Sequence, residues 1–153
     1  MATVSWEIGA SDATVINDGA TLATGVRAAG DYNNSTNLAL LCNVFLKNFH
    51  FDTTAPSANT IVADLYILPG QTGTTGFPEG GDAGLGTDDT PQAIFYVGSF
   101  ETINPSTSVE ETLALGNIPL FPEGNRFVLL NTSGQTFTNT WNLGIIPYRF
   151  TVA

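Results

Sequence analysis

The sequence predicts an all-β protein, an antiparallel β-sandwich of about eight strands with jelly-roll-like connections. Apolar and polar residues alternate in many short runs, which is the pattern of half-buried strands. Segments rich in Gly, Pro and Asn separate the runs, as turns require. The polar residues are mostly Thr, Asn and Ser, whereas helical surfaces carry many Lys and Glu, and Lys47 is the only lysine here. Eight short strands with long cross-connections fit two packed sheets.

An immunoglobulin-like sandwich is the alternative fold. Its usual Cys–Trp–Cys core is absent, because Cys42 is the only cysteine, although many such sandwiches lack that core. The whole chain, residues 1–153, is expected to form one domain, since this length suffices for one sizeable core.

The N-terminal half is expected to contain four main strands, with Thr14–Ile16 as a possible additional short one. Asn17–Gly19 reads as a tight turn and Gly30–Asn37 as a polar loop. Pro69–Pro91, with seven glycines, is the longest expected loop. The expected strands are Thr3–Ile8, Thr14–Ile16, Thr21–Ala28, Leu38–Phe51 and Asn59–Leu68.

The run Leu38–Phe51 is the longest apolar segment. A helix is the competing interpretation for Leu38–Lys47, but no capping pattern fits it and the period of two continues. Strict alternation places Cys42 on one face and Phe45, Phe49 and Phe51 on the other. A strand that is apolar on both faces must be covered on both faces.

Four strands are expected in the C-terminal half. Gly134 can close a hairpin between the last two of them. Gly144 and Pro147 then predict a bulge or an edge position. The chain ends on an apolar alternation of Tyr148, Phe150 and Val152. The expected strands are Ile94–Phe100, Ser108–Leu115, Arg126–Leu130 and Thr136–Leu143.

The charge balance argues against two classes of partner. Fourteen acidic and four basic residues give a net charge of −10, which repels nucleic-acid backbones and anionic membranes. The N-terminus lacks the charged and apolar regions of a secretory signal, so synthesis in a cytoplasm is expected.

We expect no catalytic residues, no cofactor and no metal. His50 has no nucleophile-elbow pattern near it. Cys42 lies in an apolar run and is expected to be a buried small hydrophobe. The acidic residues of the long loop match no calcium-binding motif, so a solvated acidic loop is preferred. These residues are Glu79, Asp82, Asp88 and Asp89.

Six aromatic residues provide a carbohydrate-binding alternative, because sugars stack on exposed rings. Trp6 and Trp141 fall on the expected inward faces, which favours an ordinary core role for them. The six are Trp6, Tyr32, Tyr66, Tyr96, Trp141 and Tyr148.

Several segments between residues 92 and 150 resemble small β-sandwich virion proteins of tailed bacteriophages, of the capsid-decoration or cement type. The segments are Tyr96–Phe100, Asn104–Ser108, Leu113–Leu115, Ile118–Leu120, Phe127–Asn131 and Pro147–Arg149. The resemblance implies a non-enzymatic structural protein of the virion that binds the major capsid protein, or another virion protein, and stabilises the assembled shell. It also implies a homo-oligomer, with a trimer favoured. A phage tail or connector component is the alternative within this class.

The two apolar faces of Leu38–Phe51 lead to the same expectation of assembly. The loop Pro69–Pro91 offers only Phe77 and Leu85 as large apolar anchors, so a neighbouring subunit is the better cover for the second face. We expect the contact to involve seven residues: Phe45, Phe49, Phe51, Ile145, Ile146, Tyr148 and Phe150.

Overall fold

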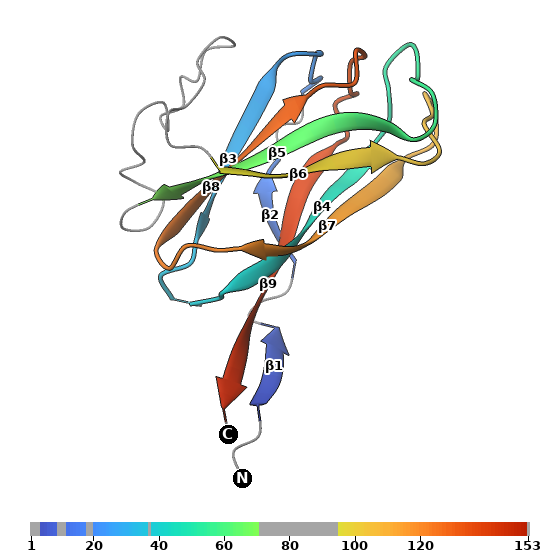
Figure 1. The fold of residues 1–153 in the computed structure, drawn as a ribbon. Coiled ribbons are helices and arrows are strands. Elements are labelled where there is room, and N and C mark those ends of the chain that lie inside the picture. Colours follow the sequence, from blue (N-terminus) through green and yellow to red (C-terminus); the bar gives the residue numbers. More distant parts are fainter. Residues whose placement is uncertain (1–3, 9–11, 18–19, 37, 71–94, 153) are drawn as a thin grey trace.

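The computed structural model describes residues 4–8, 12–17, 20–36, 38–70 and 95–152, and within these ranges the side chains of residues 8–149. Nine strands lie in this part of the chain, arranged in two facing layers (Figure 1). They are β1 (Val4–Ile8), β2 (Ala13–Ile16), β3 (Arg27–Asn33), β4 (Leu41–Phe49), β5 (Thr60–Gly70), β6 (Phe95–Thr102), β7 (Glu111–Pro119), β8 (Gly124–Asn131) and β9 (Asn142–Val152).

The strands pair as a folded double ribbon, which is the jelly-roll arrangement. β5 pairs with β6, β4 with β7, β3 with β8 and β2 with β9, each pair antiparallel and nested inside the next. Further pairing of β4 with β9 and of β5 with β8 gives the sheets β2-β9-β4-β7 and β3-β8-β5-β6. β1 adds to the first sheet by pairing with the end of β9. The predicted antiparallel β-sandwich is confirmed.

Two expected strands were wrong. In place of Thr21–Ala28 the chain makes a single bridge at Leu22, and β3 instead runs through the expected polar loop. Every residue of β3 pairs with β8, and Asp31 accepts two hydrogen bonds from Arg126, at 2.6 and 2.8 Å. Cross-strand pairing therefore outweighs the polar composition of this segment. Thr136–Leu143 is likewise no strand, because only Phe137 in it forms bridges before β9 begins.

The bulge or edge position predicted at Gly144 and Pro147 is only partly found. The register of β2 against β9 shifts next to Gly144, as a bulge would require, but β9 is an inner strand that runs on to Val152. Pro147 lies opposite Cys42 of β4. On its other side Pro147 falls between the part of β9 paired with β2 and the part paired with β1, and the described residues place no ladder partner there for its missing N–H group.

A bulge at Asn48 changes which residues of β4 face the core. Leu46 pairs with Leu113 and Phe49 with Glu111, so β4 carries one extra residue at this point. Asn48 adopts a left-handed φ of 53°, which asparagine tolerates better than most residues. The bulge keeps Phe49 on the same inward side as Leu46. Both are buried, and the strict alternation assumed from the sequence fails here.

An aromatic cluster fills one end of the core. Phe49, Phe51 and Phe137 lie with ring centroids 5.3–5.7 Å apart, and Trp141 packs on Phe137 at 6.5 Å. The indole N–H of Trp141 donates to the Ala20 carbonyl at 3.0 Å, so this large side chain is buried with its polar group satisfied.

Buried asparagine amides tie the connecting segments to this core. Asn131 Nδ2 donates to the carbonyls of Leu22 and Gln135, both at 2.7 Å. Asn34 Nδ2 donates to the Ala39 carbonyl at 2.7 Å, and Asn34 Oδ1 accepts from the Ala39 N–H at 2.9 Å. Within the described residues no buried side-chain nitrogen or oxygen lacks a hydrogen-bond partner. The loops are therefore held by specific bonds at little desolvation cost.

Replacing Phe49 by alanine tests the corrected face. Because Phe49 is 1% exposed within the aromatic cluster, we expect Phe49→Ala to lower the free energy of unfolding by about 3–5 kcal/mol. Phe45→Ala, on the outer face of the same strand, serves as the control and should cost far less. Urea unfolding followed by tryptophan fluorescence measures both. Equal losses for the two variants would contradict the bulge.

Candidate functional site

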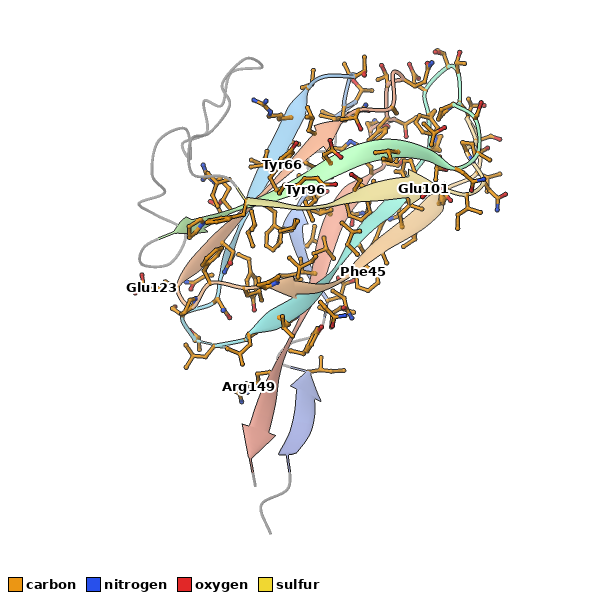
Figure 2. The ribbon with its side chains drawn as sticks, viewed as in Figure 1. Phe45, Tyr66, Tyr96, Glu101, Glu123 and Arg149 are labelled. Atoms are coloured by element: carbon orange, nitrogen blue, oxygen red, sulfur yellow. The ribbon has the colours of Figure 1, made fainter. Side chains whose placement is uncertain are left out.

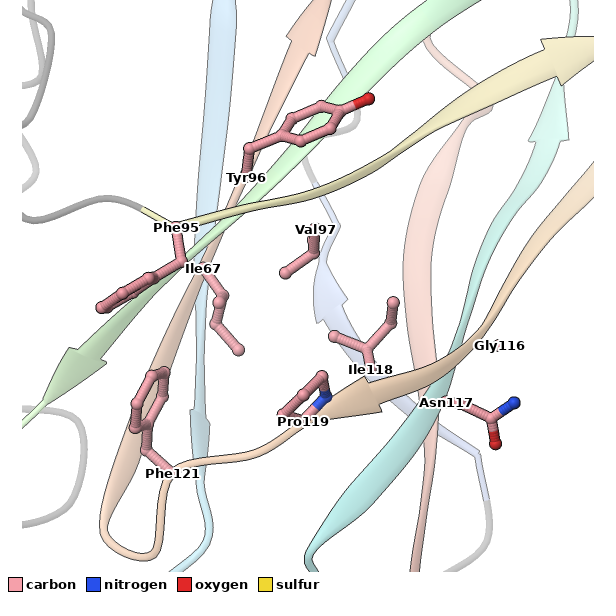
Figure 3. Close-up of a pocket in the computed structure, with 9 residues that line it drawn as sticks. All are labelled: Ile67, Phe95, Tyr96, Val97, Gly116, Asn117, Ile118, Pro119 and Phe121. Carbon is pink, nitrogen blue, oxygen red and sulfur yellow. The ribbon is translucent and has the colours of Figure 1, made fainter.

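A groove opens along one edge of the sandwich, between β6 and β7 (Figure 3). Both edge strands are bulged here. β6 carries the extra residue Val97, and β7 carries an extra residue at Gly116–Asn117, where Asn117 has a φ of 59°. Bulges re-aim side chains and bend the strand, so both strands present their side chains irregularly at this edge. The volume of the groove is about 400 Å³.

The groove is lined mainly by apolar groups. Phe95 and Tyr96 are 54% and 59% exposed, large values for aromatic side chains, and the Phe95 ring lies 5.7 Å from that of Phe121. Among the residues that the structure describes, none with a charged side chain lines it. The lining residues are Ile67, Phe95, Tyr96, Val97, Gly116, Asn117, Ile118, Pro119 and Phe121.

A two-stranded ribbon extends from the body of the sandwich. It consists of β1 and the end of β9, and Figure 1 shows both strands leaving the two packed layers together. Among the described strands, β1 makes extensive contact with β9 alone. At the base of the ribbon, Ile8 is 70% exposed.

The register of the ribbon gathers its apolar positions on one face. Directly paired residues of antiparallel strands share a face. The pairs Val4 with Val152, Trp6 with Phe150 and Ile8 with Tyr148 are all apolar, whereas the intervening pairs, Ser5 with Thr151 and Glu7 with Arg149, are polar. The apolar positions continue onto the outer face of the first sheet, where Tyr148 pairs with Leu41 of β4.

The ribbon base and the groove are neighbours on the surface. Tyr148 Oη donates a hydrogen bond to Asn117 Oδ1 at 2.6 Å, and Asn117 lines the groove. Pro119, also in the lining, pairs with Leu41. An apolar protrusion and an apolar hollow therefore lie side by side.

Three of the seven residues expected at a subunit contact are buried in the core of the single chain. Phe49, Phe51 and Ile145 are at most 1% exposed, so they have no surface to offer a neighbouring subunit. The physical reason for the two phenylalanines is the Asn48 bulge, which turns the end of β4 inward. Their assignment to a contact was wrong.

The other four expected contact residues are placed differently. Phe45, Ile146 and Tyr148 lie partly exposed on the outer face of the first sheet, and the Phe150 side chain lies outside the described part of the chain. Phe45 is partly covered by its own chain, because the Lys47 ammonium lies 5.7 Å from the centre of the Phe45 ring and pairs with Asp12. Contact through Phe45, Ile146 and Tyr148 stays a prediction.

A second cluster lies on the outer face of the other sheet. Tyr66 and Tyr96 pack edge to face, with centroids 5.6 Å apart (Figure 2). Tyr96 Oη lies 2.7 Å from Ser99 Oγ, which donates to Asp64 Oδ1 at 2.5 Å. Of the other aromatic residues weighed for sugar stacking, Tyr32 and Trp141 are buried, as expected for Trp141, and the Trp6 side chain is not described.

The residues weighed for catalysis and metal binding are not gathered into a site within the described ranges. His50 Nδ1 lies 3.4 Å from the Thr138 hydroxyl and 3.5 Å from that of Thr140. Cys42 is buried, as predicted, and burial raises the pKa of its thiol to about 12. No group of three possible metal-ligating side chains occurs among the residues described. Glu79, Asp82, Asp88 and Asp89 lie outside them.

Neither a family model nor a curated protein matches this sequence. In the described part of the chain there is no helix long and apolar enough to cross a membrane. The chain is a jelly-roll β-sandwich with a projecting ribbon and a mainly apolar groove at one edge.

Removing the Asp64 carboxylate tests the electrostatics of the tyrosine cluster. Burial raises the pKa of Tyr66, and Asp64 and Tyr96 raise it further, whereas Arg27 lowers it. Asp64→Asn should therefore make Tyr66 ionise at lower pH than in the wild type. Absorbance titration at alkaline pH, with Tyr66→Phe used to assign the signal, measures the change. Asp52→Asn, on an exposed turn, is the control, and an unchanged Tyr66 titration in Asp64→Asn would refute the arrangement.

Proposed function

We propose that this chain is a non-enzymatic structural protein of a bacteriophage virion, of the capsid-decoration or cement type. It acts as a homo-oligomer, with a trimer favoured, and binds the major capsid protein of the assembled shell. The observation that carries the proposal is the projecting ribbon, whose register collects apolar pairs on one face. The assignment to phages comes from the sequence resemblance, since a jelly roll by itself does not specify a function.

The ribbon supports a role in assembly for a physical reason. An isolated two-stranded ribbon is marginally stable in water, and one with an apolar face needs another surface to cover that face. Such an extension suits a protein that functions by binding other subunits. The sandwich supplies a firm base for it, because its core is closed and its buried polar side chains are satisfied among the described residues.

The net charge of −10 sets a condition on the shell surface. Two strongly acidic surfaces repel each other, so the shell protein must offer neutral or basic groups where this protein binds. Binding through such groups weakens as salt screens the attraction.

Co-sedimentation with assembled shells tests the proposal. We expect the full chain to pellet with shells of the parent phage, and a variant lacking residues 1–8 to bind at least about tenfold more weakly, because β1 is removed. Ile103→Ser, at an exposed position far along the chain from the ribbon, should pellet like the wild type. A full-length protein that stays in the supernatant with shells, but pellets with tails, would instead favour the tail or connector alternative.

The tyrosine cluster favours carbohydrate binding as the second candidate function. Tyr96 presents an exposed ring beside Ser99 and the Asp64 carboxylate, and sugars are held by such a combination of a stacking ring and hydrogen-bonding groups. This cluster is on the sheet opposite the one that carries the ribbon, and Tyr96, at its edge, also lines the groove.

A glycan array probed with and without calcium tests this second function. If it holds, the wild type binds at least one glycan class and Tyr96→Ala loses that binding, because the exposed ring is removed. Tyr148→Ala, which alters a tyrosine of the other sheet, is the matched control and should bind normally. An array without signal in either condition would eliminate the carbohydrate hypothesis.

A further inference from the structure

We infer that the tyrosine cluster of Tyr66 and Tyr96, together with Asp64, selects sugars that carry a protonated amino group over neutral and acidic sugars. The inference rests on the carbohydrate binding proposed above as the second candidate function, and it names the class of sugar that this surface takes. It does not depend on attachment to a phage shell.

A bulge in β6 brings the polar groups of the cluster to one face of the sheet. Residues three apart on a regular strand point to opposite faces. The register of β6 against β5 shifts at the extra residue Val97, so Tyr96 and Ser99 share the outer face, with their hydroxyl oxygens 2.7 Å apart. Asp64 lies directly opposite Ser99 in the pairing of the two strands.

The hydroxyl protons of this group are used within the group itself. Ser99 has one hydroxyl proton and donates it to Asp64 Oδ1 at 2.5 Å, because an ionised carboxylate can only accept. Tyr96 must then be the donor in its hydrogen bond with Ser99. These three side chains therefore present lone pairs to a ligand, while the Tyr66 hydroxyl can either donate or accept. An ammonium group, which donates three hydrogen bonds and accepts none, fits such a surface.

The charges around the cluster favour a cationic ligand as well. Glu101 is exposed and the residues on either side of it are buried, so it lies on the same outer face as Asp64 (Figure 2). Burial raises the pKa of Tyr66 most, Asp64 and Tyr96 raise it further, and Arg27 lowers it with the smallest effect. The negative charge thus prevails over the positive charge at the cluster, as it does in the whole chain, with its net charge of −10.

The aromatic ring explains why the ligand is an amino sugar. Tyr96 is 59% exposed, and its ring can stack on the C–H face of a sugar. The face of a tyrosine ring also attracts a cation. An amino sugar supplies both contacts and an ammonium group for Asp64, whereas an N-acetylated sugar has lost the charge. A sugar with a carboxylate would be repelled by Asp64 and Glu101.

Isothermal titration calorimetry with four oligosaccharides tests the inference. They consist of glucosamine, N-acetylglucosamine, glucose or glucuronic acid, with equal length and linkage, so that they differ mainly in charge. At about pH 6, where an aliphatic amine is protonated, we expect the glucosamine oligomer to bind at least about threefold more tightly than the glucose and N-acetylglucosamine oligomers. The glucuronic acid oligomer should bind most weakly.

Two variants of equal net charge identify the carboxylate that is responsible. Asp64→Asn retains an oxygen that accepts from Ser99 but removes the charge, so we expect the preference for glucosamine to disappear while the glucose oligomer still binds. Asp52→Asn, on an exposed turn, changes the net charge by the same amount and should retain the preference. Tyr96→Ala should bind all four oligosaccharides more weakly, because the stacking ring is removed.

Three results would each overturn the inference. Binding of the glucose oligomer as tightly as the glucosamine oligomer would do so and leave carbohydrate binding in place. An equal loss of preference in Asp64→Asn and Asp52→Asn would show that the attraction comes from the overall charge. Absence of binding to all four oligosaccharides would remove the inference and the carbohydrate function together, whereas the decoration function is judged separately by co-sedimentation with shells.

Discussion

Each strand of a sandwich can place only alternate residues in the core, and the points where this alternation is interrupted determine the rest of the structure. On β4 the interruption is Asn48, which allows Phe49 to follow Leu46 into the core and so permits the aromatic cluster. On β7 it is Asn117, where the strand shifts its register against β4. Both residues adopt a left-handed φ, which asparagine accepts at lower cost than most side chains, so the sequence places a suitable residue at each bulge.

The same constraint explains why the two open edges of the sandwich differ. Between β2 and β3 the chains approach so closely that a Cβ at Gly30 would lie 1.8 Å from the Val15 carbonyl oxygen, so glycine is required there. Between β6 and β7 the bulges fall on both strands, next to the residues that line the groove. One edge therefore depends on a missing side chain, whereas the other carries an extra residue on each strand.

Local alternation was sufficient to predict the fold class and the apolar face of Val4, Trp6 and Ile8, because both depend on neighbours two residues apart. The face of Phe49 was missed because a bulge shifts the phase by one residue, and the only signal was the consecutive polar pair Lys47–Asn48. β3 was missed because its pairing with β8, about a hundred residues away, is not encoded in local polarity. The groove depends on the register of two bulged edge strands, for which no local pattern exists.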